Sequence, residues 1–209
     1  NEALSSNTTG NWNTANGSEA LTSNTTGYAN TAIGAYSQHS NTTGDYNTST
    51  GGYSMYSNTT GYANTATGFY SLQGNTSGFD NTGTGFGTLH DNTSGYKNTA
   101  SGFEALYSNI SGFNNTANGY HALKSNTTGN YNSAHGYGSL FSNIDGAKNT
   151  ANGNYTLYNN IDGDYNTGNG YGSLELNTSG SGNTSNGFAS LYKNTTGNHL
   201  KGIYRGRYI

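Results

Sequence analysis

The sequence predicts an all-β protein, a parallel β-solenoid (a β-roll or β-helix) of about twelve coils with 17 residues each. The main evidence is the tetrapeptide N-T-T-G, or a close variant, which recurs every 17 residues without insertion or deletion. Its Asn occupies positions Asn7, Asn24, Asn41, Asn58, Asn75, Asn92, Asn109, Asn126, Asn143, Asn160, Asn177 and Asn194. A fixed period of this length is typical of stacked repeats, in which each unit shares a thin core with its neighbours.

Two glycine positions divide the unit. The unit reads N-T-T-G-x-x-N-T-A-x-G-x-x-A-L-x-S, and we number its positions as slots 1 to 17 from the Asn of N-T-T-G. Gly fills slot 4 in every unit, and slot 11 in every unit except the last, where Tyr204 replaces it. Gly recurs where the backbone needs a positive φ or must approach another segment closely. We therefore expect one coil per unit, with its main turns at slots 4 and 11 and room for two or three short strands.

Leu and small residues predict the interior of each coil. Slot 15 is Leu in nearly every unit, with Met55 and the polar Gln38 as exceptions, and slot 9 holds Ala, Ser or Gly. Slot 7 is Asn, whose side chains can hydrogen-bond up a stack at about 4.8 Å per coil. In slot 2, Ile110, Ile144 and Ile161 replace Thr, which indicates a partly buried position. At that spacing, the coils would form a rod roughly 55–60 Å long.

Slots 8 and 10 are expected to point outward together, because side chains alternate along a strand and slot 9 is small and inward. In three consecutive units these slots hold Thr48, Thr50, Thr65, Thr67, Thr82 and Thr84. Slot 12 adds an aromatic row at Phe69, Phe86, Phe103, Tyr120, Tyr137, Tyr171 and Phe188. These rings are expected either to stabilise the solenoid by stacking or to form an adhesive, oligomerising face.

Composition limits the classes of function. The chain has no Cys for a disulfide or thiolate metal site, and its net charge of −3 gives no electrostatic case for nucleic acid. No run approaches about 18 apolar residues, so no membrane insertion is expected. Nearly every position has near-copies in other units, whereas an enzyme needs one unique site. We therefore predict a non-catalytic protein without a cofactor.

The titratable residues give no catalytic or metal-binding pattern. No Ser or Thr is grouped in the sequence with a His and an acid, as a hydrolytic triad requires. Asp145 and Asp162 stack on adjacent coils with Asp164 nearby. Such a cluster could bind a cation weakly, but we expect it to be solvated, with no metal site.

Slots 1 to 3 also form the N-x-[S/T] triplet of glycosylation acceptors. The candidate sites are Asn7, Asn24, Asn41, Asn58, Asn75, Asn92, Asn109, Asn126, Asn177 and Asn194, with further triplets at Asn47, Asn154 and Asn183. Glycans are wider than one coil, so full occupancy is not expected, and the triplet has a sufficient structural cause in the turn before Gly.

The end of the chain departs from the repeat. We divide the sequence into a repeat domain over 1–197 and a C-terminal cap or docking strand over 198–209. The expected assembly residues are Ile203, Tyr204, Arg205, Arg207, Tyr208 and Ile209. An open solenoid exposes unpaired strand edges, so this strand either caps the last coil or docks on the first coil of another subunit. The first residue lies within a unit and is not Met, as expected for a processed product or a fragment.

The whole unit, as in 105–119, resembles 17-residue arrays of phage tail-fibre and bacterial surface proteins. The half-unit N-T-A-x-G also resembles the head β-rolls of trimeric autotransporter adhesins, although those heads use a shorter unit. These resemblances imply a shaft or adhesive segment of an extracellular fibre, on a cell surface or virion, and an oligomer. The implied partners are other copies of the chain and a glycan or protein receptor on a cell surface.

A second resemblance implies a different function. Slots 5 to 11, x-x-N-T-A-x-G, resemble the half-coils of grass ice-recrystallisation inhibitors, with Ala in place of Val. The likeness implies ice binding through the outward Thr-x-Thr array described above. Elsewhere slot 10 holds other residues, such as Asn118 and His135, which break the array.

Overall fold

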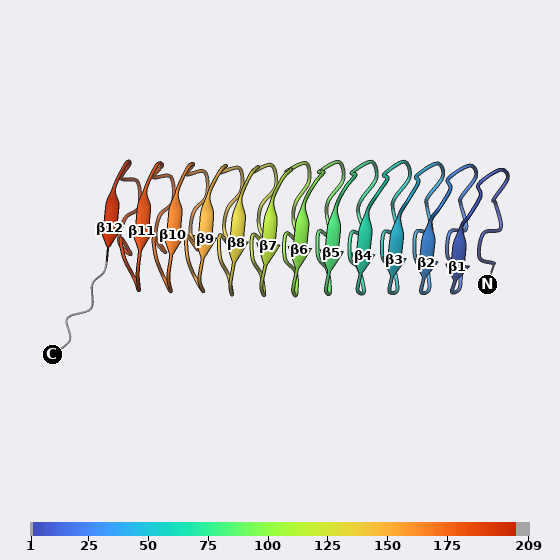
Figure 1. Cartoon of the computed structure of the whole chain (residues 1–209), viewed down its shortest axis with the longest axis horizontal. Helices are drawn as coiled ribbons and strands as arrows, with labels where there is room; N and C mark the ends of the chain where they lie inside the picture. Colours follow the sequence, from blue (N-terminus) through green and yellow to red (C-terminus); the bar gives the residue numbers. More distant parts are fainter. Residues whose placement is uncertain (1, 204–209) are drawn as a thin grey trace.

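The computed structural model describes residues 2–203 and confirms the all-β parallel solenoid. The coils stack as a rod, with β1 and β12 at its opposite ends (Figure 1). Each coil contributes one short strand to a single 12-stranded sheet along one side, so the expectation of two or three strands per coil is wrong. The strands are β1 (Thr14–Asn16), β2 (Thr31–Ile33), β3 (Thr48–Thr50), β4 (Thr65–Thr67), β5 (Thr82–Thr84), β6 (Thr99–Ser101), β7 (Thr116–Asn118), β8 (Ser133–His135), β9 (Thr150–Asn152), β10 (Thr167–Asn169), β11 (Thr184–Asn186) and β12 (Lys201–Ile203). No helix in the described residues is long and apolar enough to cross a membrane.

Neighbouring strands pair slot against slot, so the register of the sheet repeats the period of the sequence. For example, Thr65 of β4 is the partner of Thr82 in β5. Backbone pairing continues beyond the strands: the Gly85 amide donates to the Thr67 carbonyl at 2.8 Å, and slot 13 amides donate likewise to slot 12 carbonyls of the preceding coil. Each slot therefore forms a column of equivalent residues along the rod.

The apolar half of the interior is the column of slot 15. Its Leu side chains, such as Leu72, Leu89 and Leu106, have no exposed surface and belong to one cluster with the small residues of slots 9 and 14. This confirms the Leu-against-small packing that the repeat predicts. Burial of a Leu side chain contributes about 1.5–3 kcal/mol, so the column is the main apolar source of stability.

Gln38 interrupts this column. It separates a short apolar cluster around Leu21 from the long cluster that begins at Met55. Gln38 Nε2 donates to the Thr31 carbonyl and to Ser49 Oγ, both at 2.9 Å, whereas Gln38 Oε1 is buried without a hydrogen-bond partner. A buried acceptor without a partner is destabilising.

The other half of the interior is polar and consists of two Asn columns that share a column of Gly carbonyls. In slot 1, Asn92 Nδ2 donates to Asn75 Oδ1 at 2.7 Å and to the Gly95 carbonyl at 3.1 Å, and Asn92 Oδ1 accepts from Asn109 Nδ2 at 2.7 Å. The Gly95 carbonyl also accepts from Asn81 Nδ2, of slot 7, at 2.8 Å. These buried amides are paired on both sides, as buried polar groups require.

The Asn ladder expected in slot 7 is present in the middle of the rod. Asn81 Nδ2 donates to Asn64 Oδ1 at 3.1 Å, and Asn81 Oδ1 accepts from Asn98 Nδ2 at 3.2 Å. The same side chain also bonds to backbone, since Asn81 Oδ1 accepts from the Asn98 backbone amide at 3.1 Å and Asn81 Nδ2 donates to a Gly carbonyl. A second, longer ladder in slot 1, which was not expected, continues from Asn7 to Asn194.

Neither Gly column leaves room for a methyl group, and slot 11 also requires a positive φ. In slot 4, a methyl group on Gly95 would collide with Asn92 Oδ1, Asn109 Nδ2 and the next Gly carbonyl, so this Gly supplies space. In slot 11, Gly102 has a φ of 123°, a conformation that L side chains rarely adopt. Slots 6, 13 and 15 also turn the chain with positive φ, and there they are mostly filled by other residues, such as Leu106 at 53°. The expectation of main turns at slots 4 and 11 is therefore corrected.

Slot 2 is half-buried where it holds Thr in the middle of the rod, as expected, but the expectation is wrong for its Ile residues. Ile110, Ile144 and Ile161 are 46%, 44% and 42% exposed. Where slot 2 is Thr, its hydroxyl extends the backbone pairing, as when Thr76 Oγ1 donates to the Thr93 carbonyl at 2.9 Å. The backbone carbonyl of slot 2 accepts hydrogen bonds from the preceding coil whether its residue is Thr or Ile, as Ile110 does from Thr93. This explains why both residues fit there.

The last described strand belongs to the solenoid. Strand β12 pairs with β11 in the common register, with Lys201 opposite Thr184 and Ile203 opposite Asn186, so the coils continue past the boundary expected at residue 197. Ile203 is exposed at the end of the described chain. The other expected assembly residues, Tyr204, Arg205, Arg207, Tyr208 and Ile209, lie outside the described residues.

Replacing Gln38 by Leu should stabilise the rod. The change removes a buried acceptor without a partner and joins the two apolar clusters, which should raise the free energy of unfolding by about 1–2 kcal/mol. Thermal unfolding followed by circular dichroism should show a Tm higher by about 2–6 °C. Gln73→Leu, in the half-buried slot 16, is the control and should change the Tm much less; a Tm of Gln38→Leu at or below wild type contradicts the prediction.

Replacing Asn92 by Ala should destabilise the rod strongly. The change leaves Asn75 Oδ1 buried without its partner and removes one of the two bonds of Asn109 Nδ2, at a cost of about 2–4 kcal/mol. Urea unfolding of both variants measures this, with Asn16→Ala as the control. Asn16 is an exposed residue of slot 10, and its loss should stay within about 0.5 kcal/mol. Equal losses in the two variants would refute a structural role for the slot 1 column.

Candidate functional site

The most regular exposed surface is formed by slots 8, 10 and 12, and we call it the strand face. In β4, Thr65 and Thr67 are exposed on either side of the buried Ala66, and Phe69 is exposed two residues later. Strands β3, β5 and β6 show the same exposed, buried, exposed pattern. The expected outward orientation of Thr48, Thr50, Thr65, Thr67, Thr82 and Thr84 is therefore confirmed.

The Thr pairs align in register along the rod. Thr48, Thr65 and Thr82 are partners in slot 8, as are Thr50, Thr67 and Thr84 in slot 10. Together these side chains form an ordered two-column array of hydroxyl and methyl groups over three coils.

Towards the C-terminus, slot 10 changes from Thr to Asn. Asn152 Nδ2 donates to Asn169 Oδ1 at 2.9 Å, and Asn169 Nδ2 donates to Asn186 Oδ1 at 2.8 Å. The outer Asn column thus repeats on the surface the ladder found inside. It ties these side chains to each other rather than leaving them free for a ligand.

Exposed rings of slot 12 stack beside the Thr columns, and we call this row the aromatic ridge. Its members are Phe69, Phe86, Phe103, Tyr120, Tyr137, Tyr171 and Phe188. The ring centroids of Phe86 and Phe103 lie 5.2 Å apart, those of Phe103 and Tyr120 5.2 Å, and those of Tyr120 and Tyr137 5.0 Å, with planes within 10° of parallel. The expected stacking is therefore confirmed between these neighbouring rings, and the rings of the ridge stay 40–61% exposed.

Because ridge rings face one another, they present their edges to solvent. A flat partner that needs a free ring face can reach only the ends of the stack, whereas a partner that packs against ring edges can use its whole length. Within β1–β11 and the slot 12 positions that follow them, the strand face carries no Lys, Arg, Asp or Glu, and its titratable residues are His135 and the Tyr residues of the ridge. The surface is therefore uncharged, apolar on one side and hydroxyl- or amide-rich on the other.

A second aromatic stack, in slot 5, lies across the slot 6 corner from the strand face. The centroids of Tyr62 and Phe79 are 4.9 Å apart, and those of Phe79 and Tyr96 are 4.8 Å apart. Its rings are more buried than the ridge, apart from Tyr62. It provides a matched internal comparison for the ridge.

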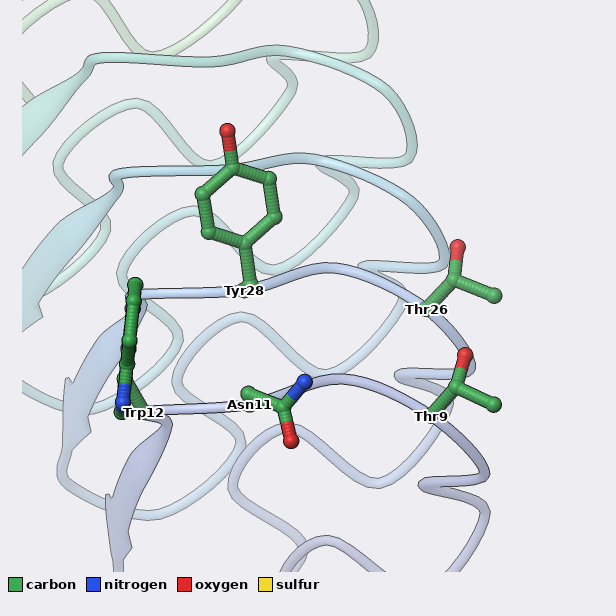
Figure 2. Close-up of a pocket in the computed structure, with 5 residues that line it drawn as sticks. All are labelled: Thr9, Asn11, Trp12, Thr26 and Tyr28. Atoms are coloured by element: carbon green, nitrogen blue, oxygen red, sulfur yellow. The ribbon is translucent and has the colours of Figure 1, made fainter.

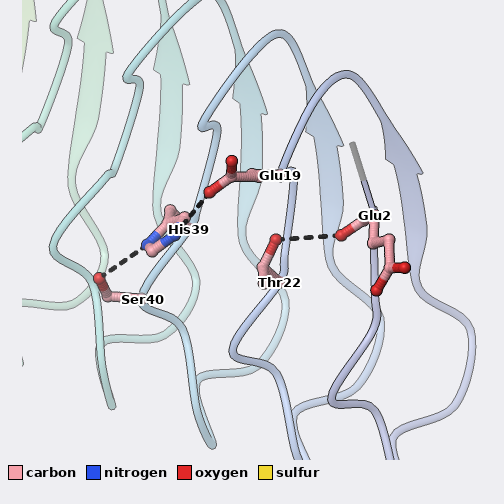
Figure 3. Close-up of polar contacts among 5 residues, drawn as sticks. All are labelled: Glu2, Glu19, Thr22, His39 and Ser40. Carbon is pink, nitrogen blue, oxygen red and sulfur yellow. Dashed lines mark hydrogen bonds and ion pairs between the residues drawn. The ribbon is translucent and has the colours of Figure 1, made fainter.

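Glu19, His39 and Ser40 form a chain of polar contacts that the sequence analysis did not expect (Figure 3). His39 Nε2 lies 3.4 Å from Glu19 Oε2, and His39 Nδ1 lies 3.4 Å from Ser40 Oγ. The statement that no Ser is grouped with a His and an acid is thus corrected, because Glu19 comes from the preceding coil. Both distances are at the outer limit for hydrogen bonds.

The same contact recurs along the rod with other side chains, which favours a structural role for it. Slot 13 of one coil meets slot 16 of the next: Glu104 Oε2 lies 2.7 Å from Lys124 Nζ, and the rings of Tyr70 and His90 lie 5.9 Å apart. Glu19 and His39 occupy these two slots. The contact is a general lateral pairing between coils, and its sequence signal is the spacing of 20 residues that the 17-residue register produces.

Two groups in this lateral pairing have shifted pKa values. Burial alone would raise the pKa of Glu104, but the hydrogen bond and charge of Lys124, helped by His121, outweigh it and lower that pKa. Burial and the charge of Lys124 lower the pKa of His121, against the pull of Glu104. By contrast, burial raises the pKa of Glu175.

The folded rod has no room for glycans at most of the candidate triplets. Slot 1 residues Asn24, Asn41, Asn58, Asn75, Asn92, Asn109, Asn126 and Asn177 are fully buried, and so are Asn47 and Asn183 of slot 7. Their Nδ2 atoms, to which a sugar would be linked, instead donate hydrogen bonds inside the rod. Glycosylation of these residues is therefore incompatible with this structure. Asn7 and Asn154 are exposed, and Asn194 is half-buried.

The acidic residues form no metal site. Asp145 and Asp162 are exposed, and Asp164 Oδ1 accepts from the Ala147 amide at 2.7 Å. Across the described chain, no group of three His, Asp or Glu residues is placed to hold a metal ion.

Comparison of the chain with protein-family models, curated proteins and solved structures finds no significant match.

The pKa shifts predict opposite pH responses for two carboxyl groups. The lowered pKa of Glu104 means that its stabilising effect is present above the ordinary carboxyl pKa and is lost as pH falls through the folded-state value. Glu104→Gln should therefore lower the Tm at pH 7, and its difference from wild type should shrink in acid. The raised pKa of Glu175 reverses the sign, so Glu175→Gln should raise the Tm at pH 7, with a gain that also shrinks as pH falls. Thermal melts from about pH 7 to pH 3 measure both, and shifts of the same sign at pH 7 would contradict the assignment.

Proposed function

We propose that this chain is a non-catalytic, adhesive rod segment of an extracellular fibre, and that rods associate side by side with other copies through the strand face. The observation that carries the proposal is the aromatic ridge. Rings that stay about half exposed in an unbroken row, here the five from Phe69 to Tyr137, are unusual on a monomer and are typical of interaction surfaces.

A second copy of the chain is the partner that best fits this surface. The ridge presents ring edges at intervals of 5.0–5.2 Å between Phe86 and Tyr137, and another rod repeats the same interval. Identical columns of side chains can then interdigitate as in a dry interface between two sheets. The strand face carries no charged side chain from β1 to β11. Two identical faces therefore meet without the repulsion that like charges would create.

The stacked interior supports a mechanical role. Successive coils are joined by backbone hydrogen bonds, the two Asn columns and the Leu column. A pulling force on the rod is therefore shared by many contacts at each junction between two coils. The predicted extracellular location and the adhesive role follow from the resemblances in sequence and are part of this proposal.

Removing the ridge should remove the association. We expect the full chain to form oligomers or laterally paired rods that are visible by sedimentation velocity and electron microscopy at micromolar concentration. The double variant Phe86→Ser/Phe103→Ser should stay monomeric, because it interrupts the exposed apolar row at its centre.

The matched control is Phe79→Ser/Tyr96→Ser in slot 5. It removes a comparable stack of rings, so its loss of stability should be similar, but it leaves the strand face unchanged. Association should therefore persist in the control. A monomeric wild-type chain, or equal loss of association in both variants, would overturn the proposal.

Ice binding is a second candidate, favoured by the in-register Thr array of β3, β4 and β5. Ordered hydroxyl and methyl groups on a flat sheet are what the resemblance to ice-recrystallisation inhibitors implies. Thermal hysteresis and recrystallisation assays separate the two functions. Ice shaping at micromolar concentration that is lost in Thr65→Lys/Thr67→Lys, but kept in the Phe86→Ser/Phe103→Ser variant, would establish ice binding instead.

A further inference from the structure

The repeat is broken on the surface by a cavity between the first two coils (Figure 2). Its volume is about 290 Å³, and it is lined by Thr9, Asn11, Trp12, Thr26 and Tyr28. Trp12 is the single Trp of the chain. None of the lining residues is charged, so the cavity suits a neutral ligand.

Trp12 has what the aromatic ridge lacks, a ring face that is open to solvent. Its side chain is 84% exposed, and none of the ring contacts within residues 2–203 involves it. The next residue in its column is Ala29, which is too small to cover the indole. An apolar surface of this size that remains open is a feature of binding sites.

The exposure of Trp12 comes from its position on the coil. Trp12 occupies the slot 6 corner with a φ of 59°. In the middle of the rod, Tyr46, Tyr131 and Tyr165 occupy the same corner and are 56%, 53% and 60% exposed. Rings in slot 6 are therefore more than half exposed in the middle of the rod as well.

The polar groups around Trp12 complete the cavity. Figure 2 shows the ring of Tyr28 face-on and the indole of Trp12 edge-on on the neighbouring coil, with Asn11 next to Trp12 in the chain. The hydroxyl groups of Thr9 and Thr26 lie along the opposite side of the same cavity. Amide and hydroxyl groups can each donate and accept hydrogen bonds, which matches the alternating donors and acceptors of sugar hydroxyls.

We propose that this cavity binds a neutral sugar unit of a glycan. The apolar C–H face of the sugar ring packs on the Trp12 indole, and sugar hydroxyls bond to Asn11 and to the Thr side chains. The volume suits one or two sugar rings, at the small end of ligand cavities. This inference rests on the proposed adhesive function and adds a partner to it, a neutral glycan. The ridge does not contribute to the cavity, so each can fail separately.

Binding at the cavity can be followed by Trp-selective fluorescence, because Trp12 is the single Trp of the full chain. The probes are the neutral oligosaccharides cellotetraose, maltotetraose, mannotetraose and tetra-N-acetylchitotetraose. At least one is expected to change the emission saturably, with a Kd of about 1 mM or tighter. Asn11→Ala should weaken that binding about tenfold or more.

Calorimetry covers the variant that lacks the reporter. Trp12→Ala should abolish the heat of binding while folding normally, since Ala29 already occupies slot 6 with a φ of 55°. Tyr131→Ala, at the same corner in another coil, should bind like wild type.

Three results would overturn the glycan site. These are no saturable change with any of the four probes up to about 10 mM, equal weakening in Tyr131→Ala and Trp12→Ala, and retained binding in Trp12→Ala. The variant Phe86→Ser/Phe103→Ser separates this inference from the proposed function, because it should lose lateral association and keep sugar binding.

Discussion

The structure depends on the carbonyl of Gly in slot 4, which accepts hydrogen bonds from two buried Asn side chains at once. In the middle of the rod this carbonyl belongs to Gly95, and its donors are Asn92 of slot 1 and Asn81 of slot 7. Only Gly leaves room for this meeting, since a methyl group would overlap the Asn92 amide. A chain with 30% hydrophobic residues can fold because the buried polar groups of this half of the core hydrogen-bond to one another. The Leu column then supplies most of the buried apolar surface.

A strict register has consequences for the surface. Each side chain lies over its equivalent in the preceding coil, so the residues of any exposed slot form a column. Where the same residue type recurs in that slot, the column presents uniform chemistry. The aromatic ridge, the Thr columns and the outer Asn column that includes Asn169 all arise in this way. The same rule explains why Glu19 and His39 meet: they stand in slots 13 and 16, which touch along the rod whatever residues fill them.

Departures from the repeat are therefore the informative positions. Gln38 divides the Leu column and leaves an acceptor without a partner, a defect that selection for stability alone would remove. Trp12 places one large open ring at a corner where the next coil has Ala29. Columns suit extended, repeating partners, whereas a unique residue such as Trp12 suits a small ligand, and the rod combines both kinds of surface.

The sequence by itself determined the fold class, the period, the Leu column and the outward Thr pairs, because a constant 17-residue spacing admits only a register that stacks equal slots. Only the tertiary structure decided which way the remaining slots face. The slot 1 Asn that reads as a glycan acceptor is buried, and the slot 2 Ile that reads as buried is exposed. The physical reason is that slots 6, 13 and 15 turn the chain with positive φ at non-Gly residues such as Leu106, which no local signal marks. Contacts between coils decide those turns, and with them the ridge, the lateral pairing and the Trp12 cavity.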